Sequence, residues 1–151
     1  MRKSVSSILV AAVLVSIFVF AGVRPAQGKA VGPPQVAWKD LTYDQKRAYM
    51  KDAVVPTMKP IFQAFDAKKY ANFGCKTCHG KDPQKTKYKM PNRELPQLDF
   101  HLLEQGKQKP NIAEWMSKTV KPQVAQILEV PQMSKDHPDG FGCLECHTEK
   151  K

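Results

Sequence analysis

The chain has 151 residues, with 24 Lys and Arg against 14 Asp and Glu, which gives a formal net charge of +10 at pH 7. This length suits one small domain and argues against a chain of several domains. The basicity by itself would suit a nucleic-acid-binding protein, but the N-terminus argues against that class.

At the N-terminus, Arg2 and Lys3 precede a charge-free apolar run over residues 4–23, which ends in the small-residue segment Ala26-Gln27-Gly28. This order predicts a secretory signal peptide over residues 1–28, and therefore a mature domain over residues 29–151 in the periplasm. The alternative is an uncleaved anchor facing the periplasm, because about 20 apolar residues can span a bilayer. Either outcome places the basic domain away from nucleic acid.

A helical module is expected over residues 40–80. Thr42 followed by Gln45 has the pattern of a capping box, which begins a helix. Tyr49, Met50 and the residues one turn further on share one helical face. Pro56 then predicts either a kink or the first residue of a second helix.

The same pattern returns 66 residues later, in a second module over residues 106–148. The segment 49–56 aligns with 115–122, so Trp115, Met116 and Pro122 take the places of their first-module counterparts. Asn111 with Glu114 resembles a capping box for this helix. The connector over residues 81–110 is rich in Pro and Lys and is expected to be irregular. The chain is therefore predicted to be mainly α, with two repeated modules.

Each module ends in one pentapeptide, and the two together use every cysteine in the chain: Cys75-Lys76-Thr77-Cys78-His79 and Cys143-Leu144-Glu145-Cys146-His147. The pattern C-x-x-C-H is the attachment site of a covalently bound haem. Two thiols reach the two vinyl groups of one porphyrin, and the adjacent histidine binds the iron.

A zinc site and two disulfides leave the repeated histidine without a cause. The two C-x-x-C pairs of a zinc site are also usually only about 15–20 residues apart, whereas 64 residues lie between Cys78 and Cys143. A thioredoxin-like redox pair requires a βαβ context, and no alternating strand pattern lies near either motif. Two haem c groups are therefore predicted. Cys75, Cys78, Cys143 and Cys146 would hold them covalently, and His79 and His147 would be the proximal iron ligands.

The far side of each iron needs its own ligand or stays open. Met50 and Met116 are the methionine pair at equivalent repeat positions, which makes them the leading distal candidates. Methionine on an apolar helix face more often packs in a core, and that alternative stays open. Weaker candidates for the distal position are Met58, Met133, Met90, His101 and His137.

These motifs resemble those of c-type cytochromes, and the duplicated module resembles small exported dihaem cytochromes. The chain departs from the single-haem class I proteins in its haem to Met-Pro spacing, and from class II in having two haems. The resemblance implies an electron carrier between redox partners in the periplasm, with no enzymatic activity and no small-molecule substrate.

Two other functions stay open: a haem peroxidase or gas-binding sensor with one open iron, and a haem subunit of a membrane redox complex. The membrane would be a partner only if the N-terminus stays uncleaved. The lysines at positions 81, 85, 87 and 89 would attract an acidic redox partner, unless they are simply a solvated loop face.

Overall fold

A computed structural model describes residues 36–151, and this part of the chain is mainly helical. Its only β pairing consists of isolated bridges, so the expected mainly α class is confirmed. None of the helices in residues 36–151 has the length and apolar character needed to cross a membrane. The predicted signal peptide over residues 1–28 lies outside the described residues.

The first helical unit follows a short 3-10 turn, η1 (Trp38–Asp40). It consists of α1 (Tyr43–Tyr49), the π-helical turn η2 (Met50–Val54) and α2 (Val55–Phe65). The predicted capping box is confirmed, because the Gln45 backbone N–H donates to the Thr42 hydroxyl oxygen while the Gln45 side chain accepts from the Thr42 N–H. The unit therefore begins where the sequence indicates.

The second helical unit has the same local structure, with α5 (Pro110–Trp115), the π-helical turn η3 (Met116–Val120) and α6 (Lys121–Leu128). The predicted cap at Asn111 is wrong. Pro110 already opens the helix, and Lys109 is the capping residue in a left-handed conformation. The N–H groups of the first turn have no partner within the helix, so proline is well suited to the first helical position. Asn111 is the second residue of the helix, two positions after the N-cap, and so it cannot cap this helix.

Each π-helical turn ends two residues before a proline. The Val55 N–H donates to the Met50 carbonyl, and the Lys121 N–H donates to the Met116 carbonyl, five residues back in each case. Pro56 and Pro122 have no N–H to continue the ordinary helical ladder. The wider turn lets each proline enter the first turn of a new helix without a sharp break.

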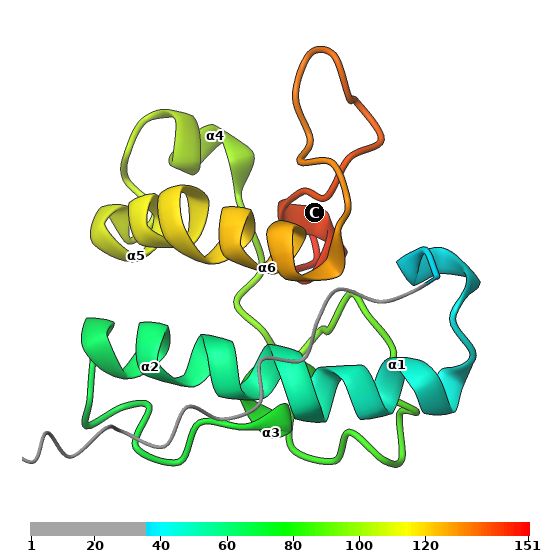
Figure 1. The fold of residues 1–151 in the computed structure, drawn as a ribbon. Coiled ribbons are helices and arrows are strands. Elements are labelled where there is room, and N and C mark those ends of the chain that lie inside the picture. The colour runs from blue at the N-terminus through cyan, green and yellow to red at the C-terminus, as the bar shows by residue number, and fades with distance from the viewer. Residues whose placement is uncertain (1–35) are drawn as a thin grey trace, which may run out of the picture.

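The two helical units lie as two layers, with α1 and α2 in one and α5 and α6 in the other (Figure 1). Between them lies a small core built on Met58, Phe62 and Tyr70. Trp115 closes it from the second unit, with its ring 4.8 Å from that of Phe62 and stacked at 4.1 Å on Phe65. Other partly buried residues pack around it: Val54, Ile61, Phe73, Met116, Val120, Val124 and Ile127.

The remaining segments are α3 (Cys75–His79), α4 (Phe100–Glu104) and the 3-10 turn η4 (Cys143–Glu145), joined by loops. The connector is irregular as expected, apart from α4 and the start of α5. It also pairs with the C-terminal segment, because the Leu98 N–H donates to the Thr148 carbonyl and the Lys150 N–H donates to the Leu98 carbonyl. The first predicted haem motif therefore directly precedes the connector in the sequence, and the segment that ends the second motif is hydrogen-bonded to the same connector.

Candidate functional site

The first cysteine motif is a single turn of helix, α3. The Gly74 N–H donates to the Thr77 hydroxyl at 3.1 Å, and the Thr77 N–H donates to the Gly74 carbonyl at 2.9 Å, which closes the turn at its start. Because residues three and four apart share a helix face, the turn brings Cys75, Cys78 and His79 to one side. Both thiols are free of disulfide bonds.

His79 is half-buried against the connector. Burial lowers its pKa below the usual range, and the nearby Tyr88 backbone opposes that shift. The Tyr88 ring meets the imidazole edge-on, with 5.4 Å between ring centroids. Among the residues that the structure describes, the buried Nδ1 atom of His79 has no hydrogen-bond partner. Lys87 and Tyr88 both have positive φ, 52° and 56°, a strained conformation that places the tyrosine at this ring.

The second cysteine motif is held differently. It starts as the 3-10 turn η4, with Cys143 exposed and Cys146 half-buried. The Nδ1 atom of His147 lies 2.9 Å from the Pro96 carbonyl oxygen. A carbonyl can only accept, so Nδ1 carries the proton and the lone pair of Nε2 is left for a metal. Such a bond orients a ligating imidazole and increases its basicity.

The two motifs lie against each other through the connector. The Asn92 backbone N–H donates to the Cys146 carbonyl at 2.9 Å, and its side-chain amide donates to the Cys78 carbonyl at 3.0 Å. Burial raises the pKa of the Cys78 thiol to about 11, with a further contribution from Cys75. Burial likewise raises the pKa of the Cys146 thiol to about 12, and Cys78 of the other motif contributes to that shift. The hydrogen bonds of Asn92 therefore join the two motifs at the carbonyls of their second cysteines.

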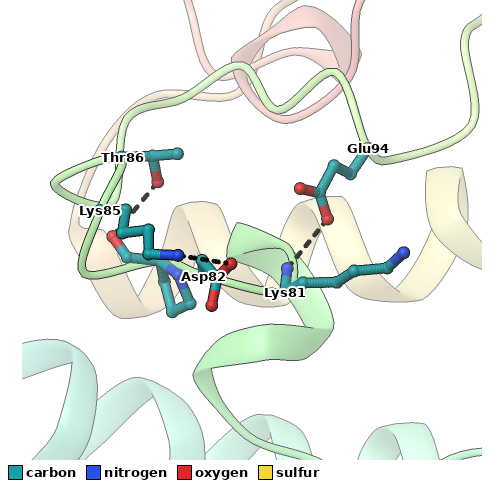
Figure 2. Close-up of polar contacts among 6 residues, drawn as sticks. Lys81, Asp82, Lys85, Thr86 and Glu94 are labelled. Carbon is teal, nitrogen blue, oxygen red and sulfur yellow. Dashed lines mark hydrogen bonds and ion pairs between the residues drawn. The ribbon is translucent and has the colours of Figure 1, made fainter.

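The loop that follows His79 is shaped by polar contacts (Figure 2). The Lys81 N–H donates to the Glu94 carboxylate at 2.9 Å, and Lys85 pairs with Asp82 at 3.5 Å. Gly80 is required here, because its φ is +83° and a Cβ atom would lie 2.8 Å from the Glu94 carboxylate. The lysine side chains of this loop are exposed: Lys81, Lys85, Lys87 and Lys89.

The candidate distal methionines are spread over several elements. Met50 and Met116 both open a π-helical turn and are half-buried, and Met116 also packs against the core. Met58 is only 2% exposed and lies within that core, beside Phe62. Met58 therefore has the environment of a packing residue.

Two methionines lie outside the helices. Met133 is 46% exposed, and a Cβ atom on Gly142 would come within 3.0 Å of its sulfur. Its thioether thus lies beside the residue that precedes Cys143. Met90 is half-buried in the connector, two residues before Asn92.

The two remaining histidines are exposed and held by local contacts. The His101 ring, on α4, lies 2.7 Å from the side chain of Gln105, the residue that follows this helix. The backbone N–H of His137 donates to the Ser134 hydroxyl oxygen within the loop before the second motif. Neither contact involves His79 or His147.

Residues that sequence reasoning missed are Asn92, Pro96 and Tyr88. All three belong to the connector, which has no periodic pattern and no motif. Their partners are 14, 51 and nine residues away along the chain. Only the folded connector brings them to the motifs, so no local signal could have found them.

The arrangement fits covalent haem at both motifs. Each supplies two free thiols and an imidazole at the required spacing, and at His147 the nitrogen that would face iron is free of hydrogen bonds. Within residues 36–151 no three His, Cys, Asp or Glu side chains are grouped so that they could hold a metal ion by themselves.

No family model, no curated protein and no solved structure matches the chain.

Proposed function

We propose that this chain is an exported dihaem c-type cytochrome that carries electrons between redox partner proteins. The observation that supports it best is the meeting of two complete C-x-x-C-H motifs on one connector residue, Asn92. Haem bound at such sites supplies one-electron redox chemistry. Two adjacent sites would let one end of the protein accept an electron and the other end donate it.

In this proposal each residue of the motifs has one role. Cys75 and Cys78 hold one porphyrin, and Cys143 and Cys146 hold the other. His79 and His147 are the proximal ligands. Met50 and Met116, which open equivalent turns of the two helical units, are the distal ligands.

The proposed partner at the first motif is an acidic protein. The segment over residues 73–92 holds five lysines and one aspartate, and all five lysines are exposed. Positive charge of this density increases the rate of encounter with an anionic partner and makes it depend on salt. Lys85 is partly neutralised by Asp82, which leaves Lys87 and Lys89 as the free charges nearest Tyr88.

Haem content is the decisive measurement. The full chain is expressed in the bacterial periplasm together with a haem-attachment system, and covalent haem is counted by the pyridine haemochrome assay and by mass. We expect two haems in the wild type and one in each of the variants C75A/C78A and C143A/C146A. A wild type without covalent haem would refute the proposal. The mass also identifies the mature N-terminus.

Ligand-binding spectra separate the carrier from a peroxidase or gas sensor. A carrier with both irons six-coordinate keeps low-spin spectra, with no shift when cyanide is added to the ferric protein or carbon monoxide to the reduced protein. A shift equivalent to one haem would favour the sensor or peroxidase instead.

The distal ligands are tested by single replacements. Met50→Ala and Met116→Ala should each remove half of the near-infrared charge-transfer band of methionine-bound ferric haem. Met58→Leu and Met133→Leu serve as controls, because leucine removes the thioether and keeps most of the apolar volume. A band that persists in the first two variants and is lost in the controls would transfer the role to Met58 and Met133.

A further inference from the structure

Asn92 is the one polar side chain that is buried within residues 36–151, with 9% of its surface exposed. Burial of an amide without partners costs about 1–3 kcal/mol, so a buried asparagine normally has a specific bonding role. It lies in the irregular connector, outside every helix. The hydrophobic core is formed elsewhere, on Met58, Phe62 and Tyr70.

The backbone N–H, the backbone carbonyl, the side-chain nitrogen and the side-chain oxygen of Asn92 each make one hydrogen bond. Its backbone N–H donates to the Cys146 carbonyl at 2.9 Å, and its side-chain amide donates to the Cys78 carbonyl at 3.0 Å. Its side-chain oxygen accepts from the Glu94 N–H at 2.9 Å, and its carbonyl accepts from the Leu95 N–H at 3.2 Å. The last two bonds hold the residue in a tight turn of the connector.

The two acceptors in the motifs are equivalent. Cys78 and Cys146 are each the second cysteine of a motif, and each directly precedes the histidine that would bind iron. A hydrogen bond to that carbonyl restrains the peptide that carries the histidine. One residue therefore restrains both histidine-bearing peptides and sets the distance and angle between them.

Close packing supports the same role. A Cβ atom on Gly80, the residue after His79, would lie 3.0 Å from the side-chain nitrogen of Asn92. The absence of a side chain at Gly80 lets the amide reach the Cys78 carbonyl. The second motif has Thr148 at the equivalent place and is bonded through the Asn92 backbone instead.

We propose that Asn92 is a positioning residue that sets the relative geometry of the two haem motifs and thereby the coupling between the two haems. This rests on the proposed function, because coupling requires both sites to be loaded. The two hydrogen bonds from Asn92 to the Cys146 and Cys78 carbonyls, called the Asn92 bridge below, belong to the polypeptide. Their effect on hydrogen exchange can be measured whether or not haem is bound.

Two variants separate the bonds of the bridge. Asn92→Asp keeps the oxygen that accepts from the Glu94 N–H but replaces the donor to Cys78 with an oxygen. Asn92→Ala removes both side-chain bonds and keeps the backbone bond to Cys146. Asn72→Asp and Asn72→Ala are matched controls, because Asn72 is exposed and precedes the first motif by only three residues.

Three readouts are taken on the full haem-loaded protein: haem count, circular dichroism in the Soret band and hydrogen exchange by mass spectrometry. The wild type should show two haems and the paired positive and negative bands of two coupled chromophores. Both Asn92 variants should keep two haems but lose at least half of that paired signal. Exchange in segment 75–80 should rise about tenfold, which corresponds to one lost hydrogen bond. Exchange in segment 143–148 should change much less, because both variants keep the backbone bond from Asn92 to the Cys146 carbonyl.

The outcomes distinguish the two proposals. A wild type without haem defeats the proposed function, and hydrogen exchange in the haem-free chain then still tests the bridge. Two haems without a paired signal in the wild type overturn the inference. The inference is also overturned if the Asn92 variants match the Asn72 controls in both the spectrum and exchange. If Asn92→Ala does not fold, Asn92→Asp provides the same test.

Discussion

The two cysteine motifs have the same pattern but lie in different surroundings. The first is a turn of α-helix whose histidine is half-buried against Tyr88 and has no partner at Nδ1. The second is a 3-10 turn with an exposed first cysteine, and its histidine donates to the Pro96 carbonyl.

Their charges differ as well. Residues 73–92 hold five lysines and one acidic residue, whereas residues 132–151 hold three lysines and four acidic residues. The helical units that precede the motifs are nearly equivalent, down to the π-helical turn before each proline. Two helical units of similar local structure can thus precede cysteine motifs in different surroundings, because the connector contacts each motif in its own way.

The largest expected effect concerns the helical units. Met58 aligns with Val124 in the repeat, but Met58 is 2% exposed whereas Val124 is only partly buried. Met58→Ala should lower the free energy of unfolding by about 2–5 kcal/mol, and Val124→Ala by about 1 kcal/mol. Urea unfolding followed by circular dichroism measures both. Equal losses would mean that the two units contribute equally to the core.

The residue after each histidine gives the next contrast. Gly80→Ala forces a side chain into a backbone with φ of +83° and against Glu94, so a loss of about 1–3 kcal/mol is expected. Thr148 has a buried hydroxyl without a hydrogen-bond partner. Thr148→Val should therefore leave stability unchanged or increase it. Thermal unfolding of the two variants is the measurement. A larger loss of stability in Thr148→Val than in Gly80→Ala would contradict the expectation that the residue after His79 is the more constrained of the two.

Charge reversal tests the difference in surface charge. Lys87→Glu with Lys89→Glu should slow oxidation of the reduced protein by the anion hexacyanoferrate(III) about tenfold at low ionic strength. Lys135→Glu with Lys151→Glu is the matched control at the second motif and should change the rate much less. Stopped-flow absorbance follows the reaction. Added salt should reduce the difference, and equal slowing by both pairs would argue against a preferred docking face at the first motif.

The smallest expected effect is in the reduction potentials. The bond from His147 to the Pro96 carbonyl would make the imidazole a stronger donor to the iron of a bound haem, and a stronger donor would favour oxidised iron. His79 has no such bond. A bond of about 1 kcal/mol corresponds to about 40 mV for one electron. The variant C75A/C78A, which keeps the second motif, should therefore have a midpoint potential about 40 mV below that of C143A/C146A in a spectroelectrochemical titration. The reverse order would contradict this reasoning.

The local features were predictable because their causes are local. The capping box at Thr42 depends on residues three apart, and the helical class follows from apolar spacing along one face. The Asn111 cap failed for an equally local reason, since Pro110 takes the first position of the helix. The π-helical turns were not predicted, although the proline that favours them was recognised in both modules.

The role of the connector could not be predicted in this way. Its proline-rich segment has no hydrophobic period, so nothing in its local sequence indicates which groups it will contact. Asn92 reaches the Cys78 and Cys146 carbonyls, and Pro96 reaches His147, only after the chain has folded back across both motifs.

The spacing of cysteines and histidines alone indicates which atoms could hold haem, because that chemistry is confined to five consecutive residues. How the two motifs face each other depends on hydrogen bonds between residues up to 54 positions apart, such as the bond from Asn92 to Cys146. Such bonds form only when tertiary folding has brought partners that are distant along the chain within hydrogen-bonding distance. The relative placement of the two sites, and the difference between them, is therefore a property of the folded structure.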